Sequence, residues 1–116
     1  MVHLEPNQRA VRIVKAESNS ISIYGIYNKK ATFAAMRALN WSGFKLWNYL
    51  NLNQSGYELG LSMKDVVKEC GMNKNTYYTA VKELIDKGYL VEVELYPNLT
   101  GYLFIEQGYG GETEGT

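Results

Sequence analysis

Residues 74–82 contain the side chains of this sequence that are best suited to bind another molecule. The segment holds two lysines, one asparagine, two threonines and two tyrosines, and it contains no acid. Asparagine can form two hydrogen bonds with the edge of an adenine, and threonine methyl groups can contact thymine methyl groups. Lysine, threonine and tyrosine can also bind phosphate oxygens. These residue types suggest contact with double-stranded DNA, and an ordinary solvated helix surface is the alternative explanation.

Eight residues are candidates for this contact. If residues 74–87 form a helix that enters the major groove, its outward side chains meet the DNA, and lysines on the preceding helix approach the DNA backbone. The candidate DNA-binding residues are Lys64, Lys68, Lys74, Asn75, Thr76, Tyr78, Thr79 and Lys82. So few clustered lysines predict a modest non-specific affinity, because each neutralised phosphate adds to salt-dependent binding.

Catalytic and metal chemistry have little support in the sequence. The single histidine, His3, and the single cysteine, Cys70, are far apart and form neither a triad nor a zinc ligand set. We therefore expect no catalytic residue, no metal, no cofactor and no small-molecule ligand. One cysteine excludes an intramolecular disulfide and fits a reducing compartment. The sequence has no signal-peptide core and no apolar run of 18 residues, so we expect a cytoplasmic protein without a membrane role.

Capping residues between Ser62 and Leu90 predict a helix-turn-helix. Ser62 followed by Asp65 forms a capping box that begins a helix, and Gly71 ends it in the left-handed conformation that glycine favours. Asn73 then caps a second helix, which runs from Lys74 to Lys87. The inward faces of the two helices are expected to be Met63, Val66, Val67 and Cys70, and then Tyr77, Ala80, Val81, Leu84 and Ile85.

The segments around this motif predict a winged helix of the α+β class. Residues 90–95 alternate as a strand, residues 97–101 are turn-forming, and residues 102–105 form the return strand, so a β-hairpin wing follows the second helix. Residues 31–39 and 41–51 are expected to be helices, the second capped by Asn40. Its stripe of Phe44, Trp47 and Leu50, widened by Leu46 and Tyr49, is expected to pack in the core.

The N-terminal residues are expected to stand apart from this domain. Residues 10–14 and 20–24 are typical of strands, and residues 17–19 could form the turn of a hairpin between them. We predict an N-terminal extension over residues 1–30 that could provide a dimer contact. We predict a winged-helix domain over residues 31–107 and a disordered tail over residues 108–116.

Charge is distributed unevenly, although the formal net charge is zero. The balance is +5 over residues 1–50, zero over residues 51–88 and −5 over residues 89–116. Glu92, Glu94 and Glu106 make the expected wing acidic, whereas wings that hold DNA often carry lysine or arginine. The basic residues Arg9, Arg12, Lys15, Lys29 and Lys30 could supply positive charge from the N-terminal side, although a solvated surface explains them equally well.

The stretches 39–50 (LNWSGFKLWNYL), 56–62 (GYELGLS), 71–77 (GMNKNTY) and 80–90 (AVKELIDKGYL) carry a family resemblance. They resemble a winged-helix DNA-binding domain family of phages, plasmids and related mobile elements of Gram-positive bacteria. The resemblance covers roughly residues 39–107 and implies a winged-helix fold. Its members include replication initiator domains and transcriptional regulators.

The main hypothesis is a sequence-specific double-stranded DNA-binding protein, acting as a homodimer, that regulates transcription or replication of a phage- or plasmid-type element. A dimer is expected because one helix reads few base pairs, and two half-sites multiply specificity. The rival hypothesis is a winged-helix protein-interaction module that does not use the motif on DNA, since fold does not determine function.

Overall fold

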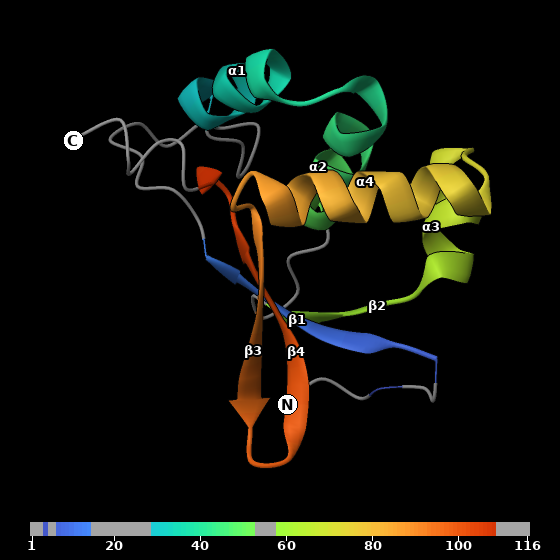
Figure 1. Ribbon diagram of the computed structural model, residues 1–116, viewed down its shortest axis with the longest axis vertical. Coiled ribbons are helices and arrows are strands. Elements are labelled where there is room, and N and C mark those ends of the chain that lie inside the picture. The colour runs from blue at the N-terminus through green and yellow to red at the C-terminus, as the bar shows by residue number, and fades with distance from the viewer. Residues whose placement is uncertain (1–3, 5–6, 15–28, 53–57, 109–116) are drawn as a thin grey trace.

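The computed structural model describes residues 4, 7–14, 29–52 and 58–108 (Figure 1). In chain order, its helices and strands are β1 (Arg9–Val14), α1 (Lys29–Ala38), α2 (Trp41–Leu52), β2 (Glu58–Leu61), α3 (Met63–Cys70), α4 (Lys74–Asp86), β3 (Leu90–Tyr96) and β4 (Leu99–Ile105). The helices lie on one side of the sheet, and the β3–β4 hairpin, which we call the wing, extends away from them (Figure 1). The fold is α+β, a winged helix-turn-helix.

The turn between α3 and α4 is built as its capping residues predict. Ser62 Oγ accepts a hydrogen bond from the Asp65 N–H at 3.2 Å, and α3 begins there. Gly71 ends α3 with φ 66° and ψ 42°, in the left-handed region where a side chain is strained. Asn73 Oδ1 then accepts from the Thr76 N–H at 2.8 Å and caps α4. The predicted helix-turn-helix is therefore confirmed, with α4 ending at Asp86.

The N-terminal strand β1 lies inside the sheet, whose strand order is β2-β1-β4-β3. It pairs antiparallel with β2 and parallel with β4. Val11 and Ile13 of β1 belong to the same hydrophobic core as the helices. Residues 9–14 thus form part of the same packed unit as the wing and the helix-turn-helix.

Trp47 of α2 joins the helices to the sheet at the centre of the core. Its side chain is fully buried, and its ring lies edge-on to Phe104 of β4 with the centroids 6.3 Å apart. The indole Nε1–H donates to the Glu106 carbonyl oxygen at 3.1 Å, so the polar end of the buried ring is satisfied. The predicted core stripe of α2 is confirmed for Leu46, Trp47 and Leu50, which are completely buried.

Three details differ from the sequence-based expectations. Ile85 was expected to face inward but is 43% exposed, because it lies 100° around the helix from the buried Leu84. The wing turn is tighter than expected, since only Pro97 and Asn98 separate the strands and Asn98 adopts φ 63°. β2 was not expected, because four residues that include Gly60 show little periodicity. The predicted strand over residues 20–24 lies outside the described residues, as does all of the tail predicted over residues 108–116 except Gly108, which is buried.

A carboxylate of α4 binds the N-terminus of α2. Glu83 Oε2 accepts a hydrogen bond from the Asn40 backbone N–H at 2.8 Å, and its side chain is only 9% exposed. Lys87 Nζ lies 3.0 Å from the same oxygen and donates to the Ala38 carbonyl at the end of α1. A negative charge at a helix N-terminus satisfies an unpaired N–H and is favoured by the helix dipole. One ion pair therefore links α4 to both neighbouring helix ends.

Gly43 makes room for this contact. A Cβ at this position would lie 2.0 Å from Glu83 Oε1, so alanine must displace the carboxylate. We expect Gly43→Ala to destabilise the fold by about 1 kcal/mol, since the lost capping bond outweighs the better helix propensity of alanine. In a Glu83→Ala background the same substitution should instead stabilise by up to about 1 kcal/mol. Urea unfolding of the four proteins measures both effects, and equal effects of Gly43→Ala in the two backgrounds would contradict the assignment.

Candidate nucleic-acid interface

The first two turns of α4 present polar side chains to solvent. Lys74, Asn75 and Thr79 are exposed, Thr76 is half-buried, and Tyr78 is 53% exposed. The opposite face holds the buried Tyr77, Ala80 and Leu84. The helix is amphipathic, so packing on α2 turns the polar residues outward.

Two of the candidate side chains form a hydrogen bond or an ion pair within the described part of the chain. Thr79 Oγ1 donates a hydrogen bond to the Asn75 carbonyl oxygen at 3.0 Å. Its hydroxyl proton is therefore already bonded within the helix, and its methyl group is the part that can still contact a ligand. Lys82 Nζ forms an ion pair with Asp86 Oδ2 at 2.7 Å, with both side chains more than half exposed. Asp86 therefore offsets the Lys82 charge. Lys82 is for this reason a weaker candidate for binding phosphate than the sequence indicates.

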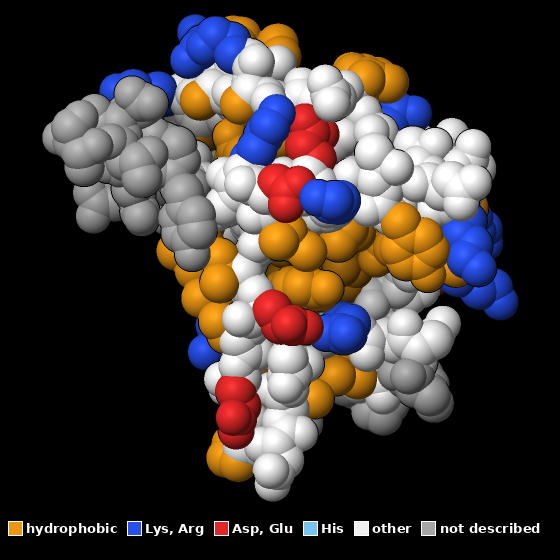
Figure 2. All heavy atoms as spheres, in the orientation of Figure 1, with side chains coloured by type: hydrophobic (Ala, Val, Ile, Leu, Met, Phe, Trp, Pro, Cys, Tyr) orange, Lys and Arg blue, Asp and Glu red, His pale blue; other side chains and the backbone are white. Residues whose placement is uncertain are grey.

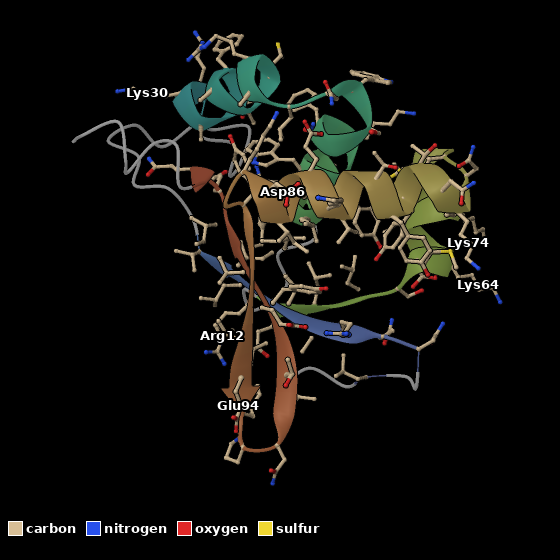
Figure 3. The ribbon with its side chains drawn as sticks, in the orientation of Figure 1. Arg12, Lys30, Lys64, Lys74, Asp86 and Glu94 are labelled. Atoms are coloured by element: carbon tan, nitrogen blue, oxygen red, sulfur yellow. The ribbon has the colours of Figure 1, made fainter. Side chains whose placement is uncertain are left out.

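Lys64, Lys68 and Lys74 are exposed where α3 meets α4. Figure 3 shows Lys64 and Lys74 at the same end of the molecule, distant from Lys30. In the space-filling view, basic side chains gather at that edge (Figure 2). Within the described part of the chain, no carboxylate pairs with these three lysines. They form a cationic end next to the first turn of α4, and we call it the α3–α4 basic end.

Arg9 of β1 lies between the wing and α4. Its guanidinium is 3.3 Å from Glu92 Oε2 and sits over the Tyr102 ring, 5.5 Å from the centroid. Arg9 is half exposed, and its charge acts on Tyr77 of α4. In the sequence, Arg9 is only one of five basic residues whose placement is unknown, because nothing local indicates that β1 is a central strand. Its position makes it a further candidate for contact with a ligand on α4.

The wing is less acidic at its surface than the sequence indicates. Glu106 follows β4 and is completely buried, so it does not belong to the wing surface. Glu94 Oε2 accepts from the Asn98 N–H at 3.1 Å and closes the wing turn. Glu92 is paired with Arg9. The expectation of three exposed wing acids is wrong for Glu106, and the two others each have a local partner.

Tyr77 is a buried residue of α4 that lies next to Tyr78 and Tyr102. It is 7% exposed, and its ring meets Tyr78 edge-on with the centroids 5.4 Å apart. Burial is the main cause that raises the pKa of Tyr77 to about 12; neighbouring Tyr102 and Tyr78 contribute to this rise, and the Arg9 charge opposes it. The neutral phenol is therefore favoured in the folded state.

Other chemistry finds little support within the described residues. No three His, Cys, Asp or Glu side chains gather there in a way that could hold a metal ion. Burial raises the pKa of the Cys70 thiol, and Cys70 packs against the core, which fits a packing role. None of the described helices is long and apolar enough to span a membrane.

The comparison with protein families gives one match. Residues 46–90 match the family model described as a helix-turn-helix domain, which covers the end of α2, β2, α3 and α4. Helix-turn-helix domains are typically non-enzymatic and suggest a DNA partner. Searches among curated proteins and among solved structures returned no match.

The raised pKa of Tyr77 predicts a loss of stability in alkali. Unfolded tyrosine ionises near pH 10 and folded Tyr77 near pH 12, so the folded state binds the proton more tightly between these values. Stability from this group is complete below pH 10 and is lost as the pH rises towards 12. Tyr77→Phe should flatten this loss in urea unfolding measured at pH 9, 10 and 11. Equal slopes for the two proteins would show that Tyr77 titrates normally.

Proposed function

We propose that the protein binds double-stranded DNA sequence-specifically, with the first two turns of α4 in the major groove. The observation that carries the proposal is the exposed, acid-free face of α4 that begins with Lys74 and Asn75, in a segment that matches helix-turn-helix domains. In this motif the second helix enters the groove and its N-terminal residues reach base edges. Asn75 suits an adenine, and Thr76 and Tyr78 suit phosphate or base contacts.

The α3–α4 basic end supplies the electrostatic part of this binding. Lys64 and Lys68 lie one turn apart on the exposed face of α3, and Lys74 begins α4. These lysines form no ion pair with a carboxylate of the described residues, so binding to a phosphate would not require such an ion pair to break. Three such contacts predict a salt dependence of log Kd with a slope of roughly 3.

We further propose that the protein acts as a homodimer and regulates transcription or replication of a phage- or plasmid-type element. A single α4 reads few base pairs, so two copies on paired half-sites give the specificity that regulation needs. The biological setting rests on the resemblance of residues 39–107 to winged-helix domains of mobile elements. The prediction of a dimer contact in residues 1–30 remains a prediction; β1, its described strand, has both backbone edges paired inside the sheet.

A protein-interaction role is the second candidate. Tyr78 and Ile85 are seven residues apart on one face of α4 and are both exposed, and Figure 2 shows apolar surface between α4 and the sheet. An exposed apolar stripe on a helix is typical of protein contacts. Absence of DNA binding at low salt would favour this candidate over DNA binding.

The test of DNA binding is fluorescence anisotropy with mixed genomic fragments at two or more salt concentrations. We expect Lys74→Ala to weaken binding to all sequences and to lower the salt slope by about 1, because one phosphate contact is lost. Asn75→Ala should instead reduce discrimination among DNA sequences, by about 1–3 kcal/mol at one base pair. Sequences selected from a random pool by the wild-type protein supply the specific target.

Lys30→Ala is the matched control, since it removes one exposed lysine at a distant part of the surface (Figure 3). It should leave the affinity and the salt slope unchanged. If Lys30→Ala weakens binding as much as Lys74→Ala while circular dichroism shows both folded, α4 is not the reading surface. If none of the proteins binds DNA at low salt, the proposed function is wrong.

Substitution of Glu92 is expected to strengthen DNA binding, whereas substitution of Lys74 is expected to weaken it. Glu92→Gln removes a carboxylate near α4 and releases Arg9 from its ion pair, so we expect DNA binding to become about 2- to 10-fold tighter at low salt. Glu94→Gln removes the same charge two residues further along β3 without releasing an arginine, and its effect should be smaller. Equal affinities for wild type and Glu92→Gln would show that Arg9 and the base of the wing do not face the DNA.

A further inference from the structure

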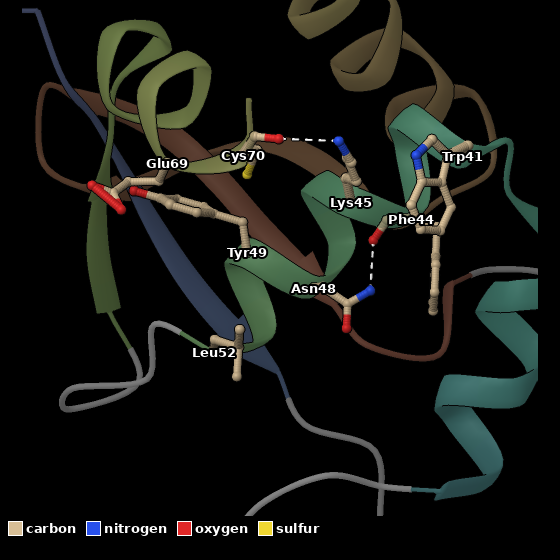
Figure 4. Close-up of a pocket in the computed structure, with 8 residues that line it drawn as sticks. All are labelled: Trp41, Phe44, Lys45, Asn48, Tyr49, Leu52, Glu69 and Cys70. Carbon is tan, nitrogen blue, oxygen red and sulfur yellow. Dashed lines mark hydrogen bonds between the residues drawn. The ribbon is translucent and has the colours of Figure 1, made fainter. Parts of the chain in front are cut away.

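A shallow groove runs along the outer side of α2. It has a volume of about 560 Å³ and is lined by Trp41, Phe44, Lys45, Asn48, Tyr49, Leu52, Glu69 and Cys70 (Figure 4). Trp41 at one end of the helix is 71% exposed and Leu52 at the other end is 59% exposed. Both are large apolar side chains that the rest of the described fold leaves uncovered. This groove lies outside the DNA-binding candidates, and none of the contacts described so far accounts for it.

The spacing of the groove residues is that of a helix-packing seam. Trp41, Lys45, Asn48 and Leu52 follow one another at steps of four, three and four residues, which places them along one line of α2. This step pattern occurs where two helices pack side by side. Each end of the line is apolar and its centre is polar. A polar pair at the centre of such a seam fixes the register of the partner helix.

From this pattern we propose that the α2 groove is the contact between two copies of this chain, with the two α2 helices packed antiparallel about a two-fold axis. The axis passes between Lys45 and Asn48, so Trp41 of each copy packs on Leu52 of the other. The proposal rests on the proposed function, because it assigns a surface to the homodimer that this function requires. A two-fold contact uses the same patch on both copies, which must therefore be complementary to itself.

Charge supports the antiparallel direction. Lys45 lies towards the Trp41 end of the groove, and Glu69 lies at the other end beside Tyr49 (Figure 4). Lys45 Nζ donates to the Cys70 carbonyl at 3.1 Å and lies 5.7 Å from the centroid of the Trp41 ring, so its charge is held in the groove. Antiparallel packing brings Lys45 of one copy towards Asn48 and Glu69 of the other. Parallel packing would place two lysines and two tryptophans against each other, and like charges disfavour it.

Sedimentation velocity over a range of concentrations tests the contact. We expect wild type to form a dimer, and Trp41→Ser and Leu52→Ser each to raise its dissociation constant about 10- to 100-fold, as loss of a large aromatic or apolar contact does. Phe33→Ser is the matched control, because Phe33 is also a large apolar residue, 47% exposed, but lies on α1. It should leave the dimer intact. A wild-type protein that stays monomeric, or a dimer that only Phe33→Ser weakens, would overturn the proposal.

Cysteine cross-linking tests the direction of packing. In a Cys70→Ser background, Trp41→Cys and Leu52→Cys proteins are oxidised separately and as a mixture. The antiparallel seam predicts a disulfide-linked dimer mainly in the mixture, whereas cross-linking mainly within each separate protein would contradict it. DNA binding is measured in parallel by anisotropy. If the protein dimerises through α2 but binds no DNA, the proposed function is refuted and the α2 contact is not. If the protein binds DNA but Trp41→Ser leaves its dimer unchanged, the α2 contact is refuted and the proposed function is not.

Discussion

The Glu83 carboxylate at the N-terminus of α2 fixes the C-terminal part of α4 against the ends of two other helices. It binds the Asn40 N–H directly and draws Lys87 to the end of α1, so three helix ends meet at one small group of charges. The close approach is possible only because Gly43 has no side chain. These contacts lie at the C-terminal part of α4, and none of the ion pairs among the described residues involves its first two turns. The ion pair thus fixes one end of α4, the buried Tyr77, Ala80 and Leu84 pack its inner face on the core, and the outer face of its first two turns is exposed.

The sheet gives the second constraint, through the placement of β1 between β2 and β4. On the outer face of the sheet, Arg12 bonds to Glu58 of β2 at 3.0 and 3.1 Å and lies over the Tyr96 ring of β3. Tyr96 also donates to Glu58 at 2.7 Å, and these contacts raise the pKa of Arg12. On the other side of the strand, Arg9 lies next to Glu92 and Tyr102. In this one short strand, Arg12 thus links β2 to β3 across the outer face of the sheet, and Arg9 lies on the side of α4.

The sequence predicts the elements whose signals are local. Capping by Ser62 and Asn73 and the left-handed Gly71 act over a few residues, and they predict α3, the turn and α4 nearly to the residue. The place of β1 depends on pairing with residues about 50 and 90 positions away, and no local pattern encodes that choice. The same limit applies to the site. The exposed face of α4 follows from helical periodicity, but the partners of Lys82 and Glu92 depend on how the elements meet.

Net charge says little about this molecule because its charges are arranged locally. Asp86, Glu58 and Glu92 are each bonded to a basic side chain, and Glu106 is buried, so much of the acidic content is not free to repel an anion. The three lysines of the α3–α4 basic end pair with no carboxylate of the described residues. At physiological salt, charges more than about 8 Å apart are largely screened from one another. The electrostatic energy of a phosphate near α4 would therefore depend on the nearby lysines and Arg9 rather than on the net charge of the chain. A protein with zero net charge can for this reason still present a surface that favours DNA.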